Sequence, residues 1–232
     1  MVLVKTDISR KCSEGWVDNN MSVKFGLKIL HPERMNKDIL IALNNHIRLA
    51  LKNTSATDIQ KWGGERLYNK MMWSDTAWAI GTSGELKGEL GITDTAALWN
   101  ILKAISENSS FKIRGPRITG KQISMSMRYE AVPVDLTQYE SIGVQITEKG
   151  QSLPWFQWLT TLGDAVIVRD FEVQAGFPQW SRTGDKIMVK GKGWRVPPSH
   201  SGSPGNNFIT KAADEALQEI GNEWVQQIRR VL

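Results

Sequence analysis

The segment from Gly115 to Gln122, GPRITGKQ, is the closest approach of this sequence to a nucleotide-binding motif. It has the glycine and lysine spacing of a phosphate-binding loop, GxxxxGK[ST], except at its last position. There the mechanism needs a hydroxyl group on the magnesium ion, and Gln122 supplies none. Such a loop must also open a helix whose amides bind phosphate, whereas Ile123 to Met127 alternates like a strand. The segment therefore predicts no nucleotide hydrolysis.

Other catalytic and metal-binding patterns are missing from the sequence as well. His31, His46, His200 and Cys12 do not have the spacing of metal ligands, and there is no CxxC, HExxH or GxSxG motif. Cys12 stands in a polar stretch without a nearby histidine to activate it. Carboxylate pairs occur, as they do in any chain of this length. We therefore expect that the protein is not an enzyme and that it has no catalytic residue, metal site or cofactor.

The ten tryptophans are the clearest departure from average composition. Trp155 and Trp158, in LPWFQWL, could stack on sugars or bases. Tryptophan is also favoured at protein interfaces, where the large ring is buried and its N–H finds a partner. Because the tryptophans are spread from Trp16 to Trp224, core and interface roles are the better interpretation.

The net charge of +5 is concentrated in residues 180–195, WSRTGDKIMVKGKGWR. This basic segment holds five basic residues against one acidic residue. It could bind phosphate or an acidic protein surface, or it could be a solvated hairpin whose lysines prevent edge-to-edge aggregation. The residues expected to make interactions are Arg182, Lys186, Lys190, Lys192, Trp194, Arg195, Trp155 and Trp158.

Length and composition limit which class of protein this chain can be. With 232 residues, 41% of them hydrophobic, the chain is long and apolar enough to bury a core. No apolar run is long enough to span a membrane, and the N-terminal sequence lacks the apolar region of a secretory signal. A single cysteine cannot form an internal disulfide. We expect a soluble globular protein made in the cytoplasm.

Helices are predicted where apolar residues recur at helical spacing. His31-Pro32-Glu33 is typical of a helix start, and a second helix is expected to begin between Thr54 and Asp58. Short helices are predicted at 98–105 and 153–161. The last helix runs from a cap at Asn206 or Asn207 to Leu232, with acidic residues early and arginines late.

Strands are predicted at residues 21–30, 123–127, 139–147, 165–173 and 186–190. The fold class is therefore α+β, with an N-terminal helix pair, a central and mainly antiparallel sheet, and a long C-terminal helix packed on the sheet. We expect one domain spanning residues 1–232. Within it, residues 1–30 form a possible N-terminal arm, and 73–97 and 191–205 are extended loops.

Two stretches carry a family resemblance. The first, TSGELKGELGI from Thr82 to Ile92, resembles a segment of bacteriophage neck and tail-completion proteins. The second stretch runs from SLPWFQWLTTLGD at residues 152–164 through residues 181–212. Its end, PGNNFITKA at residues 204–212, is similar to the start of the last helix in head–tail joining proteins. Together the two stretches cover about half of the chain.

The resemblance implies a virion structural protein in the neck or tail, part of a ring that joins the DNA-filled head to the tail. It implies six or twelve copies, contacts with neighbouring neck, connector or tail-tube proteins, and DNA passing through the lumen without sequence-specific binding. A ring is a closed set of head-to-tail contacts, so each subunit should carry two different adhesive faces. No membrane contact is expected.

Two other classes remain open from the sequence. A nucleic-acid-binding module would use the basic segment with Trp180 and Trp194, and its binding would depend steeply on salt. A cell-wall hydrolase or other hydrolase would use the tryptophan-rich part together with a carboxylate pair.

Overall fold

The computed structural model describes residues 2–10, 20–29, 37–52, 56–119, 122–131, 136–147, 150–163, 167–176, 178–184 and 186–231. Its contacts divide into two compact units. The first unit comprises residues 1–66, 108–133 and 214–232, and the second comprises residues 67–107 and 134–213. Helices α2 (Ala56–Met72) and α8 (Phe208–Val231) contribute residues to both. The single domain expected from the sequence stays a prediction.

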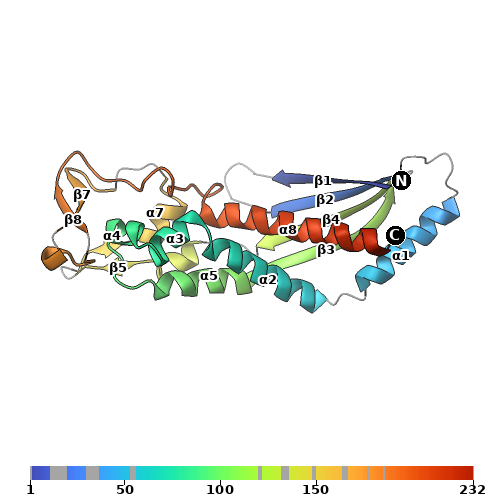
Figure 1. The fold of residues 1–232 in the computed structure, drawn as a ribbon, viewed down its shortest axis with the longest axis horizontal. Coiled ribbons are helices and arrows are strands. Elements are labelled where there is room, and N and C mark those ends of the chain that lie inside the picture. Colours follow the sequence, from blue (N-terminus) through green and yellow to red (C-terminus); the bar gives the residue numbers. More distant parts are fainter. Residues whose placement is uncertain are drawn as a thin grey trace. The chain divides into compact units, whose positions relative to one another are not determined.

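The first unit is built on a four-stranded antiparallel sheet with strand order β1-β2-β4-β3 (Figure 1). The strands are β1 (Val2–Arg10), β2 (Asn20–Ile29), β3 (Ser109–Thr119) and β4 (Gln122–Ala131). The strands predicted at residues 21–30 and 123–127 are thus confirmed and pair with each other, Phe25 opposite Met125. The alternation of apolar and polar residues that predicted these strands therefore corresponds to paired strands of one sheet.

The N-terminal residues differ from the expected arm. Residues 2–10 form an edge strand paired with β2 from Val2 opposite Ile29 to Arg10 opposite Met21. Pairing with a neighbouring strand supplies the hydrogen bonds of this segment, which short-range periodicity alone did not indicate. At the opposite edge, Gly115 to Thr119 lie in β3, where the register shifts between Arg114 and Arg117. This part of the segment that resembles a phosphate-binding loop is therefore a strand with a bulge.

Helices α1 (Lys37–Lys52) and α2 correspond to the predicted N-terminal helix pair. α1 packs against β3, and α2 begins at Ala56, within the predicted interval. The predicted helix start at His31 lies outside the described residues. α8 runs beside the four-stranded sheet (Figure 1), with Leu217 and Ile220 buried. The α+β class with a C-terminal helix on the sheet is confirmed.

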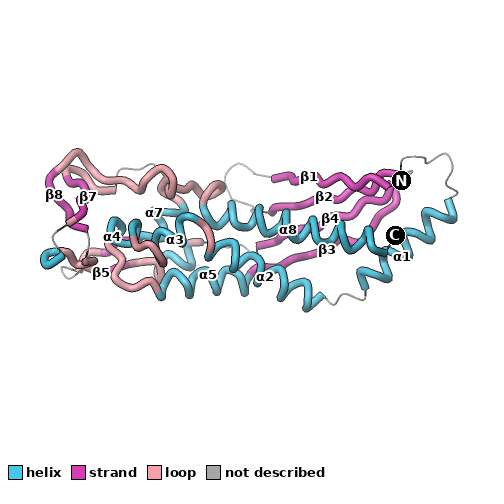
Figure 2. Tube along the Cα trace, viewed as in Figure 1, coloured by secondary structure: helices cyan, strands magenta, loops and turns pink. Residues whose placement is uncertain are grey.

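The second unit is mainly helical, with two small hairpins (Figure 2). Its helices are α3 (Asp75–Gly81), α4 (Glu85–Leu90), α5 (Ala96–Asn108), α6 (Thr137–Glu140), α7 (Trp155–Thr160) and the short 3-10 helix η2 (Pro178–Trp180). The short helices predicted at 98–105 and 153–161 are confirmed by α5 and α7. The extended loop expected at 73–97 is wrong, because α3 and α4 lie within it. Helices of six or seven residues are too short to show a period.

The hairpins of the second unit are separate from the four-stranded sheet. β5 (Gln145–Ile146) pairs with β6 (Ser152–Leu153), and β7 (Phe171–Ala175) pairs with β8 (Lys186–Lys190). The strand predicted at 186–190 is confirmed, and the one predicted at 139–147 is mostly wrong, since α6 and a turn occupy its first part. One central sheet was expected, whereas the β7–β8 hairpin is a separate two-stranded sheet. Residues 191–205 contain no helix and no named strand, as expected of a loop.

Asn207 caps α8. Its Oδ1 accepts hydrogen bonds from the amides of Ile209 and Thr210 at 3.0 and 3.1 Å, and its Nδ2 donates to the carbonyl oxygens of Ser203 and Thr160 at 3.0 and 3.3 Å. The predicted cap is confirmed at Asn207. Because the same side chain reaches α7 and the preceding loop, it joins three segments of the second unit.

Candidate functional site

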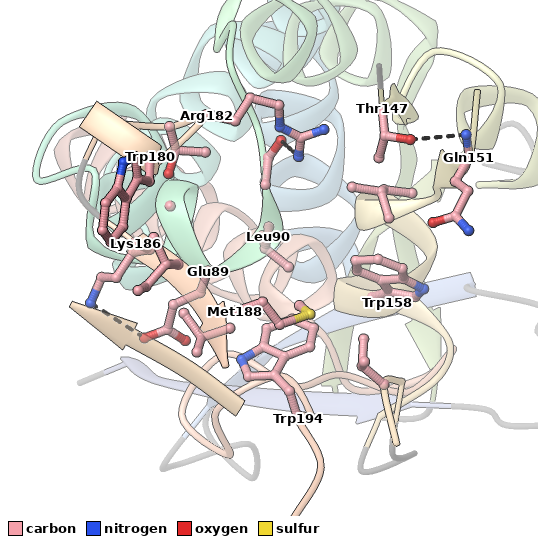
Figure 3. Close-up of a pocket in the computed structure, with 17 residues that line it drawn as sticks. Glu89, Leu90, Thr147, Gln151, Trp158, Trp180, Arg182, Lys186, Met188 and Trp194 are labelled. Carbon is pink, nitrogen blue, oxygen red and sulfur yellow. Dashed lines mark hydrogen bonds and ion pairs between the residues drawn. The ribbon is translucent and has the colours of Figure 1, made fainter. Parts of the chain in front are cut away.

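An open cleft of about 590 Å³ lies within the second unit (Figure 3). It is bounded by the end of α4, the β5–β6 hairpin, α7 and the β7–β8 hairpin. Three of the ten tryptophans line it, and we call it the tryptophan cleft. Its lining residues are Gly88, Glu89, Leu90, Gly91, Thr147, Gln151, Leu153, Trp158, Val168, Val173, Trp180, Arg182, Thr183, Lys186, Ile187, Met188 and Trp194.

Two buried tryptophans form a fixed apolar part of the cleft. Trp158 from α7 and Trp194 from the loop after β8 are each 7% exposed, with ring centroids 5.9 Å apart in an edge-to-face arrangement. The amide of Trp194 donates to the carbonyl oxygen of Val168 at 2.8 Å, and the amide of Val168 donates back at 3.1 Å. This backbone bridge holds the Trp194 ring against Trp158.

The β7–β8 hairpin forms a second wall. Val173 lies opposite Met188 in its register, and both line the cleft. Since side chains alternate between the two faces of a strand, the next pair but one, Phe171 and Lys190, lies on the same face. Phe171 and Met188 are 45% and 48% exposed. The wall therefore exposes the apolar side chains of Phe171 and Met188 to solvent, and Lys190 lies at its end.

Two basic side chains connect this wall to α4. Lys186 Nζ lies 3.8 Å from Glu89 Oε1, with both side chains mostly buried, and Arg182 donates a hydrogen bond of 2.8 Å to the carbonyl oxygen of Gly91. Gly91 has a φ of +69°, and a Cβ atom there would meet the Arg182 guanidinium. The glycine thus permits the close approach of arginine and backbone. Figure 3 shows the Lys186–Glu89 ion pair.

The structure brings together four of the eight predicted interaction residues. Arg182, Lys186, Trp158 and Trp194 line the cleft. Trp155 is a core residue, 2% exposed and edge-to-face with Phe156 at 5.8 Å.

The other three predicted residues are exposed and do not line the cleft. They are Lys190, at the end of β8, and Lys192 and Arg195, in the loop that follows.

Three further cleft residues, Trp180, Glu89 and Met188, were not among the eight predicted interaction residues, although the nucleic-acid-binding alternative named Trp180. Trp180 is the most exposed large apolar residue in the described chain, at 74%, and stands at the rim beside Arg182. Its position within the basic segment was a usable signal. Glu89 and Met188 had none, because Glu89 meets Lys186 only through contacts between distant segments.

The lining suits the binding of apolar or aromatic groups with a negative charge nearby. Its apolar surface comes from tryptophan and aliphatic side chains, and its charged groups are Arg182, Lys186 and Glu89. In the part of the chain that the structure describes, no group of three or more histidine, cysteine, aspartate or glutamate side chains could hold a metal ion. Among the same residues, no helix has the length and apolarity to span a membrane.

No protein-family model, no curated protein sequence and no solved structure matches this chain.

Proposed function

We propose that this chain is a bacteriophage virion structural protein of the neck or tail-completion region, forming part of a ring that joins the DNA-filled head to the tail. The observation that carries the proposal is the segment Pro204 to Ala212, which is similar to the start of the last helix in head–tail joining proteins.

The local structure of this segment supports the proposal. Asn207 caps α8, and Phe208 and Ala212, one turn apart, are 6% and 3% exposed. The motif residues therefore have a physical task, which is to start the helix and to anchor its first turns in a core. The resemblance implies helices packed around a sheet, and α8 runs beside the four-stranded sheet.

The first prediction concerns the phage whose genome carries this gene. A premature stop codon in the gene is expected to leave DNA-filled heads and complete tails unattached, since a missing neck ring removes the joint between them. Electron microscopy of the lysate, with and without the wild-type protein supplied in trans, measures the attached fraction. The protein should also be found by mass spectrometry in purified particles, and its absence there together with normal particles from the mutant would refute the proposal.

The basic segment is proposed to contact an acidic surface of a neighbouring ring. Lys190 and Lys192 are both exposed, at the end of β8 and just after it. The alternative, a position in the lumen facing DNA, is less favourable, because each lysine–phosphate contact strengthens binding and would retard the exit of DNA.

The second prediction is that Lys190→Glu with Lys192→Glu leaves the subunit folded but blocks the joining of tails to filled heads. Reversed charge at an acidic partner surface replaces attraction by repulsion. The control, Lys61→Glu with Lys103→Glu, makes the same charge change at exposed sites elsewhere and should leave particles normal. Normal particles that eject DNA slowly would place the lysines in the lumen, and fully normal particles would leave the segment as a solvated hairpin.

A nucleic-acid-binding module is the second candidate, favoured by the exposure of Trp180 beside Arg182. An exposed aromatic ring among basic groups suits base stacking on a single strand. Binding of a fluorescent single-stranded oligonucleotide that weakens steeply between low and physiological salt would support this candidate. Absence of binding at low salt would exclude it.

A further inference from the structure

A second exposed aromatic feature lies in the same compact unit as the tryptophan cleft. Trp73, just after α2, and Trp78, in α3, are 64% and 43% exposed, and their rings stack with centroids 5.5 Å apart and planes inclined by 23°. We call this pair the tryptophan knob. Two exposed, stacked indoles are a large apolar surface to leave in water, and tryptophan is the residue most enriched at binding hot spots.

The backbone under the knob is firmly held. Ser74 Oγ accepts a hydrogen bond from the amide of Ala77 at 3.3 Å and donates one to the carbonyl oxygen of Met71 at 2.7 Å, which caps α3 and closes the corner after α2. Met71 and Ala77 are fully buried. Since the corner is already ordered, little conformational entropy is lost when the two indoles are covered.

The tryptophan cleft complements the knob in polarity and charge. It is concave and apolar, and its rim exposes Trp180 and Met188. Exposed Asp75 stands between the two knob tryptophans in the sequence. Arg182 and Lys186 line the cleft together with Glu89, which pairs with Lys186, and Lys190 extends the wall, so basic groups outnumber the acidic one. An apolar knob with a carboxylate beside it therefore matches an apolar cleft with an excess of positive charge.

We propose that the tryptophan knob of one copy of this chain occupies the tryptophan cleft of the next copy. Knob and cleft share no residue, so the contact is head-to-tail, and each assembled pair still offers one free knob and one free cleft. Repetition of the contact generates a closed ring or an open filament. The ring is the outcome that rests on the proposed neck function; the contact itself does not depend on it.

The size of the contact accounts for its expected strength. Two tryptophans bury roughly 300–500 Å², against roughly 800 Å² on each partner in an interface of standard size. A single contact is therefore weak, and association requires high protein concentration or a template. If the proposed neck function holds, such a subunit is expected to be monomeric when dilute and to form a ring only in the particle.

The test uses two variants of the full chain and sedimentation velocity from micromolar to millimolar concentration. Trp73→Ala with Trp78→Ala removes the knob, and Trp180→Ala with Met188→Glu spoils the cleft at exposed rim positions. The wild-type protein is expected to grow in mass with concentration, and each variant to bind itself at least about tenfold more weakly. An equimolar mixture of the two variants is expected to form one-to-one dimers that grow no further, because only one intact knob and one intact cleft remain usable.

Circular dichroism verifies that both variants fold, and Ile41→Ala with Leu49→Ala, two exposed apolar residues of α1, serves as the matched control that keeps wild-type association. A wild-type chain that stays monomeric at millimolar concentration overturns the proposal, and so do variants that associate normally. A mixture that stays monomeric overturns it too, since a symmetric contact gives no complementation. Complementation in solution combined with normal particles from the gene disruption would refute the neck function and leave the contact standing.

Discussion

Ile220→Asp is expected to prevent stable folding. Ile220 is 1% exposed on the buried side of α8, next to the equally buried Ala216 and Leu217. The substitution removes apolar packing and places a carboxylate where water does not reach, which should lower the free energy of unfolding by at least about 4 kcal/mol. Because whole domains are stable by only about 5–15 kcal/mol, most of the protein should be insoluble or unfolded at 37 °C.

Two controls separate burial from helix propensity in this prediction. Gln218→Asp places the same carboxylate on an exposed position of α8 and should cost under about 1 kcal/mol. Ile220→Val keeps the site apolar and should cost about 0.5–1.5 kcal/mol. Urea unfolding followed by circular dichroism measures all three. An Ile220→Asp protein as stable as Gln218→Asp would mean that this side of α8 faces outward and is an assembly surface.

Gly202→Ala is expected to lower the stability of the protein strongly, although less than Ile220→Asp does. Gly202 is buried in the loop before α8, and a Cβ atom there would meet the carbonyl oxygen of Leu159 and lie 2.6 Å from Cβ of Asn207. These obstacles are α7 backbone and a cap side chain held by four hydrogen bonds, so neither yields without breaking the cap. We expect a loss of roughly 2–3 kcal/mol and a melting temperature lower by about 5–10 °C.

Gly205→Ala is the matched control for this substitution. Gly205 lies in the same loop, and a Cβ atom there would meet nothing within 4 Å. Its melting temperature should stay within about 2 °C of the wild-type value. Equal melting temperatures for the two variants would show that the α7–α8 corner adjusts freely and that the close packing around Gly202 contributes little.

Local sequence signals predicted the elements whose formation depends on local residues. The α8 cap, the short helix at α7 and strands β4 and β8 follow from a capping side chain or from alternation within a few residues. The predictions were wrong where an element forms only through pairing with a distant segment of the chain. β1 has a weak pattern and is a strand through its pairing with β2, and the separation of β7–β8 from the larger sheet is a matter of topology that periodicity does not encode.

In the candidate site, too, features that depend on local sequence were predicted and features that depend on distant contacts were not. The basic segment, found by composition, supplies Arg182, Lys186 and Trp194 to the cleft. The knob tryptophans, in contrast, lay in a segment expected to be a loop, and only the corner closed by Ser74 stacks Trp73 on Trp78. A pattern search finds residues of unusual type, but contacts between separate elements decide which of them meet.

The order of strands in the four-stranded sheet has a consequence for synthesis of the chain on the ribosome. β2 pairs with β4, whose first residue follows Ile29 by about ninety residues. At about 5–20 residues per second, translation leaves the β1–β2 hairpin waiting roughly 5–20 s for its neighbour, with the inner edge of β2 unpaired. An unpaired edge is a template for aggregation, and lysines within a strand oppose it. Lys24 and Lys28 stand in β2, so the nascent hairpin carries its own protection until β4 emerges.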